Sequence, residues 1–285
     1  MKKALDYASA EKYYLGKDRS AAKVGLLNRT QELLDRLLRV CGAYDVFYHG
    51  SSPSITYWRG CTGGSGLSLG ALAPDPISDL TVGGVRRGRF IRKPDVDCWE
   101  GLLYGFDANK RLRIVKHGSN QNLCQVTFVS YQGTQAAGIR YNVRLKEPEA
   151  IFVCDYGDSK RILRYSTMYI LFNNLAPERS QAVELYDAKY DYEDDLLTTA
   201  DERSVFYLEP PVPFITDGEP GNSSEERCRM KRRIYQFQID ENKYYVSWRC
   251  KDYDGDTEII DSRNDTFVPI RKHSRAHSTL RFIEE

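Results

Sequence analysis

The sequence lacks any long hydrophobic run, and no stretch approaches the roughly 18 apolar residues that a membrane-spanning helix requires. No apolar run follows Lys2 and Lys3 either, so the pattern of a secretory signal peptide is missing. Net charge is small, because 41 Lys and Arg residues stand against 40 Asp and Glu residues. A general nucleic-acid binder usually has a clear basic excess, so this balance argues against that class. We therefore expect a cytoplasmic protein that does not engage a membrane.

Paired cysteines are also absent. The seven cysteines are scattered, and no two form the Cys-x-x-Cys pair that zinc sites and redox centres use. Several of them, such as Cys154, follow apolar residues, where a free thiol packs as a small hydrophobic side chain. Residues 252–256 do not make a calcium loop, because Thr257 and Arg263 stand where an EF-hand needs Gly and Glu. We expect reduced cysteines, no bound metal and no cofactor.

Residues 20–41 have the clearest helical pattern in the chain. Their apolar residues recur at spacings of three and four, and the charged residues, Arg29 among them, lie largely off that stripe. The stripe consists of Val24, Leu27, Leu34, Leu37, Leu38 and Cys41. Asp18 or Ser20 can cap the first turn, and Gly42 stands where a glycine commonly ends a helix. The pattern predicts an amphipathic helix, either packed on the sheet of the same chain or available to a partner.

From residue 99 onward the sequence is typical of β-hairpins. Residues 103–116, 151–165 and 235–248 resemble one another: an apolar or aromatic strand enters an Asp, Asn or Ser turn, which a Lys closes before a second strand. Asp and Asn tolerate left-handed turn conformations, and the alternation places one face inward. The irregular spacing indicates recurrent hairpins and not propeller blades. Further strands are expected at residues 44–49, 55–59, 125–131, 138–145, 167–172, 182–189, 204–208, 257–261 and 266–270.

These patterns predict the α+β class, with predominantly antiparallel β-hairpins and an N-terminal amphipathic helical segment. Breaker residues divide the chain, above all in the Pro- and Gly-rich residues 209–226. The expected units are a helical segment over 1–42, a β-rich body over 43–208, a loop or linker over 209–226, and a C-terminal hairpin unit over 227–285.

The segment Tyr48-His49-Gly50-Ser51 is the motif that points most directly to catalysis. It resembles the His-Gly-Ser/Thr segment of ADP-ribosyltransferases of the His-Tyr-Glu type, in which the His holds the nicotinamide ribose. The resemblance implies a substrate-holding role for His49, with Tyr57 or Tyr104 and Glu100 as candidate partners. A glycine-rich loop follows at residues 60–76. The alternative is a His that ends a strand before a Ser-Ser-Pro turn.

Charge is unevenly distributed although it nearly cancels. Five basic side chains lie in residues 86–93, including Arg86, Arg87, Arg89 and Arg92, and five more lie in residues 227–233. Eight carboxylates lie in residues 184–202, including Asp191, Glu193, Asp194 and Asp195. Clusters of one sign can steer a partner of the opposite sign, although solvated loops beside strands also produce them.

The function that we expect is non-catalytic: the chain binds another macromolecule, most simply a protein, through these charged clusters and its tyrosine-rich hairpin faces. Inhibitors and immunity-type proteins fit this description by analogy. One alternative is an enzyme centred on His49 and the glycine-rich loop. Another is a protein that binds nucleic acid through the two basic clusters, next to which Phe90 and Tyr235 offer stacking surfaces.

Because the cysteines are odd in number and lie in apolar runs, all seven should be free thiols. Alkylation after denaturation without reductant should modify all seven, as counted by mass spectrometry. An intact Cys–Cys bridge in freshly purified protein would contradict the expected reducing compartment.

Overall fold

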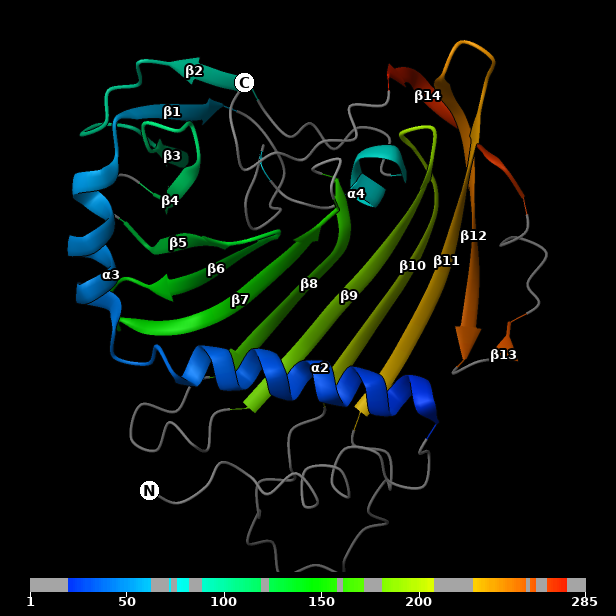
Figure 1. The fold of residues 1–285 in the computed structure, drawn as a ribbon, viewed down its shortest axis with the longest axis horizontal. Coiled ribbons are helices and arrows are strands. Elements are labelled where there is room, and N and C mark those ends of the chain that lie inside the picture. The colour runs from blue at the N-terminus through cyan, green and yellow to red at the C-terminus, as the bar shows by residue number, and fades with distance from the viewer. Residues whose placement is uncertain are drawn as a thin grey trace, which may run out of the picture.

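A computed structural model describes residues 20–62, 72, 76–81, 89–118, 123–157, 161–171, 181–207, 228–254, 257–259 and 266–275. One antiparallel sheet makes up most of this part of the chain, and helices lie against both of its faces (Figure 1). The described helices are α2 (Ala21–Leu38), α3 (Tyr44–Ser51), the 3-10 helix η1 (Ser52–Ser54) and α4 (Pro76–Thr81). Residues 1–19 of the expected helical segment lie outside the described residues.

The strands follow one another across the sheet almost in chain order. They are β1 (Tyr57–Thr62), β2 (Arg89–Arg92), β3 (Leu102–Phe106), β4 (Leu112–His117), β5 (Gln125–Gln132), β6 (Gln135–Asn142), β7 (Glu147–Tyr156), β8 (Ile162–Leu171), β9 (Gln181–Glu193), β10 (Leu196–Tyr207), β11 (Cys228–Ile239), β12 (Tyr244–Asp254), β13 (Thr257–Glu258) and β14 (Val268–Arg275). From β3 to β12 each strand pairs antiparallel with its sequence neighbours, and β1 lies between β3 and β2. The predominance of antiparallel hairpins is confirmed. In the described chain the end strands β2 and β13 do not pair with each other, so the sheet is open and does not close into a barrel.

One face of the sheet is concave and holds the larger hydrophobic core. The sheet curves so that both of its ends approach α4, which contacts β12 and β14 (Figure 1). Ile77 and Leu80 of α4 join one buried cluster with Cys61 of β1 and Tyr245 of β12. Packing here is close, since a Cβ atom at Gly138 would overlap the ring of Phe152. The concave face is therefore filled by side chains.

The long helix α2 lies across the opposite face. It begins where the sequence predicts, but it ends at Leu38, three residues before the predicted end at Cys41. The Ser20 hydroxyl accepts a hydrogen bond from the Lys23 N–H, which caps the first turn. Gly42 follows the helix with φ +77°, the left-handed conformation that glycine adopts without strain.

The buried face of α2 includes a charged side chain, Arg29, that the sequence pattern predicts to lie off this face. Leu26, Leu33 and Leu37 are buried in a cluster with residues of β7, β8, β9 and β10. Arg29 is also buried, at 7% exposure, so its expected position off the packed face is wrong. A buried guanidinium is tolerated only where other groups neutralise and hydrogen-bond it.

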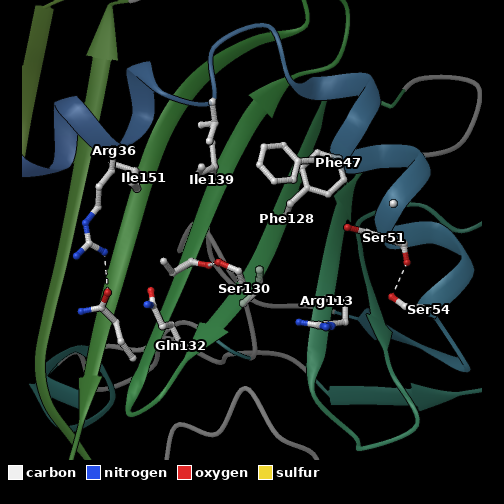
Figure 2. Close-up of a pocket in the computed structure, with 15 residues that line it drawn as sticks. Arg36, Phe47, Ser51, Ser54, Arg113, Phe128, Ser130, Gln132, Ile139 and Ile151 are labelled. Atoms are coloured by element: carbon white, nitrogen blue, oxygen red, sulfur yellow. Dashed lines mark hydrogen bonds between the residues drawn. The ribbon is translucent and has the colours of Figure 1, made fainter.

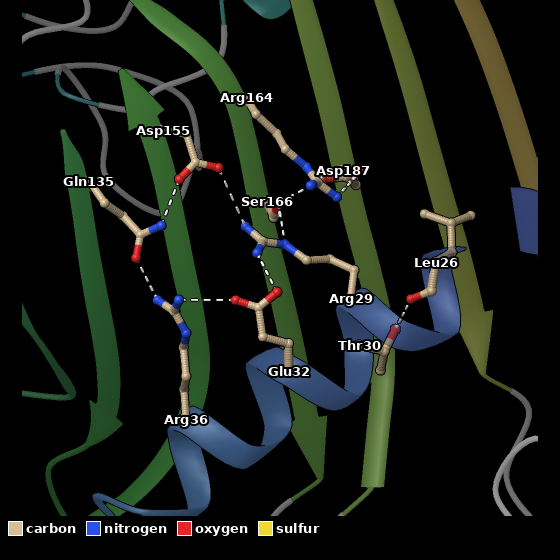
Figure 3. A network of polar contacts seen from close by, with 10 residues as sticks. All are labelled: Leu26, Arg29, Thr30, Glu32, Arg36, Gln135, Asp155, Arg164, Ser166 and Asp187. Atoms are coloured by element: carbon tan, nitrogen blue, oxygen red, sulfur yellow. Dashed lines mark hydrogen bonds and ion pairs between the residues drawn. The ribbon is translucent and has the colours of Figure 1, made fainter. Parts of the chain in front are cut away.

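Those groups come from two strands beneath the helix (Figure 3). Arg29 Nε donates to Ser166 Oγ at 3.0 Å, and Ser166 donates in turn to Asp187 Oδ1 at 2.6 Å. Arg164 binds the same carboxylate with Nε and Nη2, at 2.7 and 3.0 Å. Asp187 is 4% exposed, and this paired geometry is what makes a buried carboxylate tolerable.

A second arm of the network follows the next turns of α2. Glu32 accepts a hydrogen bond from Arg29 Nη1 at 2.7 Å and pairs with Arg36 Nη2 at 3.0 Å. Arg36 donates to Gln135 at 2.6 Å, and Gln135 donates to Asp155 at 2.6 Å. Burial raises the pKa of the Glu32 carboxyl, but the hydrogen bond and charge of Arg29, with help from Arg36, outweigh it and lower the pKa. Polar contacts therefore fix α2 to β6, β7, β8 and β9.

Two hairpin turns are built from the same Asp-x-Asn-Lys sequence. In the β3–β4 turn Asp107 Oδ1 accepts from the N–H groups of Asn109 and Arg111, and Lys110 has φ 60°. In the β11–β12 turn Asp240 Oδ1 accepts from the equivalent N–H groups, and Lys243 has φ 64°. The hairpin predictions for residues 103–116, 151–165 and 235–248 are confirmed.

Residues 44–49 form most of α3, and the predicted strand there is wrong. Tyr44, Phe47 and Tyr48 recur at helical spacing. The Tyr44 and Phe47 rings pack on Phe128 of β5, with ring centroids 5.9 and 5.7 Å apart. Aromatic residues favour strands on average, but this docking on the sheet selects the helix.

The C-terminal strands continue the sheet of the body. β11 pairs with β10 from Thr199 opposite Gln236 to Tyr207 opposite Cys228. The expected linker at residues 209–226 lies outside the described residues. The expected hairpin unit over 227–285 thus begins with a strand that shares its hydrogen bonds with β10.

If the network under α2 holds the helix in place, Asp187→Ala should lower the free energy of unfolding by about 3–5 kcal/mol, because Arg164 loses its counter-charge and Ser166, which binds Arg29, loses its acceptor. Urea unfolding followed by fluorescence measures the loss. The control is Asp45→Asn, which breaks the exposed ion pair with Lys146 and should cost less than about 1 kcal/mol. Equal losses in the two variants would contradict the assignment.

Candidate functional site

Five hairpin turns share one rim of the sheet. In a meander of antiparallel strands every second turn falls at the same edge, so the turns after β3, β5, β7, β9 and β11 follow one edge of the sheet. Those after β9 and β11 stand at the upper right in Figure 1. Described turn residues are exposed in four of them, namely 108–111, 132–134, 193–195 and 241–243.

The β9–β10 turn is the acidic part of this rim. Asp191, Glu193, Asp194 and Asp195, all expected binding residues, are exposed there. Asp194 and Asp195 have φ values of 44° and 75°, the left-handed pair that a tight two-residue hairpin requires. Asp191 accepts a hydrogen bond from Thr199 at 2.8 Å. The hydrogen bond and charge of Arg161 lower the pKa of the exposed Asp195 carboxyl. We call these four residues the acidic tip.

The remaining acidic residues of the same run behave differently. Asp187 is buried in the network under α2, and Asp201 binds Arg203 at 3.0 Å and Arg232 at 3.0 Å. Glu202 lies 3.8 Å from Arg233. Pairing with β11, whose basic residues come from the 227–233 cluster, neutralises this part of the run. The sequence presents the eight carboxylates as one cluster, whereas the sheet leaves the four of the acidic tip exposed and pairs three others with arginines. The eighth, Glu184, is half-buried, and burial raises its pKa.

The expected basic site is not brought together with the acidic tip. Arg86 and Arg87 lie outside the described residues, Arg89 begins β2, and Arg92 ends it with an exposed side chain. In the order of the sheet β2 and β9 are separated by β1 and β3 to β8. In the second basic cluster Arg232 and Arg233 form ion pairs with acidic residues of β10 and β12.

A pocket that the sequence did not indicate lies between α2 and α3. It has a volume of about 420 Å³, and its floor is formed by β5, β6 and β7 (Figure 2). One part of its wall is apolar and consists of Phe47, Phe128, Ile139 and Ile151. Another part carries polar groups, among them Arg36, Ser51, Arg113, Ser130 and Gln132. No sequence pattern marks this site, because its lining comes from two helices and four strands.

His49 lies beside this pocket but does not line it. Its neighbours Gly50 and Ser51 do, while the His49 side chain is exposed in the last turn of α3. Tyr57 is half-buried at the start of β1, Tyr104 is fully buried in β3, and Glu100 is exposed. The residues that the resemblance implies as partners of His49 thus range from fully buried to exposed.

Residues 66–70 carry the Gly-x-Ser-x-Gly spacing that hydrolases use at a nucleophilic serine, here Ser68. They lie outside the described residues, as does most of the glycine-rich loop. In the ranges that the structure describes, no three His, Cys, Asp or Glu side chains gather so as to hold a metal ion. None of the described helices has the length and hydropathy for crossing a bilayer. Compared with known proteins, the sequence matches no family model and no curated protein.

The ion pairs of Asp201 should appear in the pH dependence of stability. Burial raises its pKa, but the hydrogen bonds and charges of Arg232 and Arg203 outweigh this and hold the pKa below its ordinary 3.8. Asp201 therefore stabilises the fold above that pH, and the contribution is lost as pH falls through the lowered pKa. We expect Asp201→Asn to destabilise the protein at neutral pH and the difference from wild type to shrink in acid. Urea unfolding across this range measures it, and a difference that stays constant would refute the pairing.

Proposed function

We propose that this chain is a non-catalytic binding protein that engages a basic surface of a protein partner through its acidic tip. The observation that carries the proposal is the division of the acidic run. Asp187, Asp201 and Glu202 are paired with arginines inside the sheet, while the four carboxylates of the acidic tip are exposed together on one hairpin. Arg161 forms an ion pair with Asp195 of the tip.

The tip is held rigidly from below. Tyr192 donates a hydrogen bond to the carbonyl of Ile162 at 2.9 Å, and the Leu197 N–H donates to Tyr245 at 2.7 Å. Tyr190 and Leu197 are buried in the concave core. A surface that is ordered before binding loses less conformational entropy when a partner docks. This order favours binding of a partner to the tip without a change in its conformation.

The negative charge of the acidic tip favours electrostatic attraction of a basic partner. Exposed carboxylates raise the rate of encounter with a basic partner and suppress binding to acidic molecules, nucleic acid included. An inhibitor or immunity-type protein that blocks a basic site would use this chemistry. That narrower assignment rests on analogy.

The experiment compares two matched variants. The first neutralises the acidic tip by Asp191→Asn, Glu193→Gln, Asp194→Asn and Asp195→Asn, since Asn tolerates the left-handed turn. The second neutralises four exposed carboxylates elsewhere by Asp35→Asn, Asp45→Asn, Asp95→Asn and Asp97→Asn. Both remove four negative charges, so they differ in position alone.

Affinity capture from extracts of the source cells at low and moderate salt identifies partners of the wild type, and binding kinetics follow with the purified partner. We expect the tip variant to bind about tenfold more weakly or worse, chiefly through a slower and salt-dependent association rate. The control variant should bind as the wild type does. Equal loss in both variants, or in neither, would refute the proposal.

Two further substitutions address the other candidate functions. Loss of the partner or of a product with His49→Ala or Ser68→Ala, while the tip variant is unaffected, would indicate an enzyme. Loss on replacing Arg86, Arg87, Arg89 and Arg92 would indicate an acidic partner such as nucleic acid.

A further inference from the structure

We infer that the pocket between α2 and α3 binds a small amphipathic monoanion: an organic molecule with an apolar body and one carboxylate or sulfonate group. This site is distinct from the acidic tip and does not depend on the proposed function. Its volume of about 420 Å³ is within the range that small-molecule sites occupy.

The apolar body would lie against the floor and the helix α3. Phe128 and Ile139 rise from β5 and β6, and Phe47 faces them from α3 (Figure 2). Phe47 and Phe128 stack with ring centroids 5.7 Å apart and an interplanar angle of 24°. Two rings and an aliphatic side chain form a surface that suits an aromatic or alkyl group.

The charged group would be held by Arg113. Phe106 pairs with Leu112 and Gly105 with Ile114, so Arg113 lies in a bulge of β4, and bulges re-aim side chains. Its Nε contacts Asp107 at 3.1 Å and its guanidinium lies 5.8 Å from the Tyr131 ring centroid. Within the described residues its two Nη groups have no hydrogen-bond partner, which leaves two parallel donors for a carboxylate.

Other polar groups of the pocket fit the same ligand. The side-chain amide of Gln132 and the hydroxyl of Ser51 also have no hydrogen-bond partner among the residues that the structure describes, and both line the pocket. The other charged residue of the lining is Arg36, whose guanidinium is already engaged by Glu32 and Gln135. No carboxylate lines the pocket. A lining with guanidinium, amide and hydroxyl donors and no carboxylate favours an anion over a cation.

Two fluorescent probes of nearly the same shape test the inference. 8-Anilinonaphthalene-1-sulfonate has an aromatic body and one anionic group, and N-phenyl-1-naphthylamine is the same body without the sulfonate. We expect saturable binding of the anionic probe, one molecule per chain, and weaker binding of the neutral probe. Near-ultraviolet circular dichroism on each sample confirms that the protein is folded, since the anionic probe also binds loosened proteins.

The chain supplies a matched control for the arginine. Arg111 and Arg113 both lie over the Tyr131 ring, at 5.5 and 5.8 Å from its centroid, but only Arg113 lines the pocket. Arg113→Gln should weaken binding of the anionic probe about tenfold and leave the neutral probe unchanged, because a charge-assisted hydrogen bond is lost. Arg111→Gln should alter neither. Ser130→Phe, which fills the pocket from an exposed position, should abolish binding of both probes.

Each of the other results would overturn the inference. Absence of saturable binding to the folded wild type would show a solvent-filled gap between the helices. Equal effects of Arg113→Gln and Arg111→Gln would show that the anion is attracted by general positive charge. Unchanged binding in a folded Ser130→Phe protein would place the probe elsewhere. None of these results bears on the acidic tip, because its variants are measured with the protein partner.

Discussion

The buried carboxylate of Asp187 is the group on which the arrangement of helix and sheet depends. It lies beneath α2, where desolvation alone would make a charge costly, and Arg164 and Ser166 satisfy it from the neighbouring strand. Ser166 also accepts the hydrogen bond of Arg29, so the strand that neutralises the carboxylate also fixes the helix. An apolar helix face could slide along the apolar sheet, whereas these directional contacts define one position and one angle for α2.

The pocket follows from that position. Because α2 is fixed across β7, β8 and β9, and the aromatic residues of α3 dock on β5, the short connection between the helices leaves a space above β5 and β6. Arg36 belongs to both features, since it ends the polar network and lines the pocket. Anything that shifts α2 should therefore alter the pocket, while the acidic tip, which packs on the concave core through Tyr190 and Leu197, should be less affected.

The meander explains why the two sites can coexist. Each hairpin needs only its neighbours for hydrogen bonding, and the two faces of the sheet are covered by separate cores. The turns at one rim are then free to carry polar residues, because they contribute little to either core. The acidic tip uses such a turn. The pocket, by contrast, uses the face of the sheet and requires two helices to close it.

What the sequence by itself determined is the set of features that arise from neighbouring residues. The Ser20 cap and the Asp-x-Asn-Lys turns were predictable because each is stabilised by hydrogen bonds and backbone preferences within a few residues. Contacts between distant residues were decided only by the tertiary structure. Arg29 is buried because Ser166 lies beneath it, and α3 is a helix because Phe128 offers a docking surface. Asp201 and Glu202 are paired because β11 lies beside β10, whereas Asp187 is paired because Arg164 of β8 lies beside it, and no local pattern records which strand becomes a neighbour.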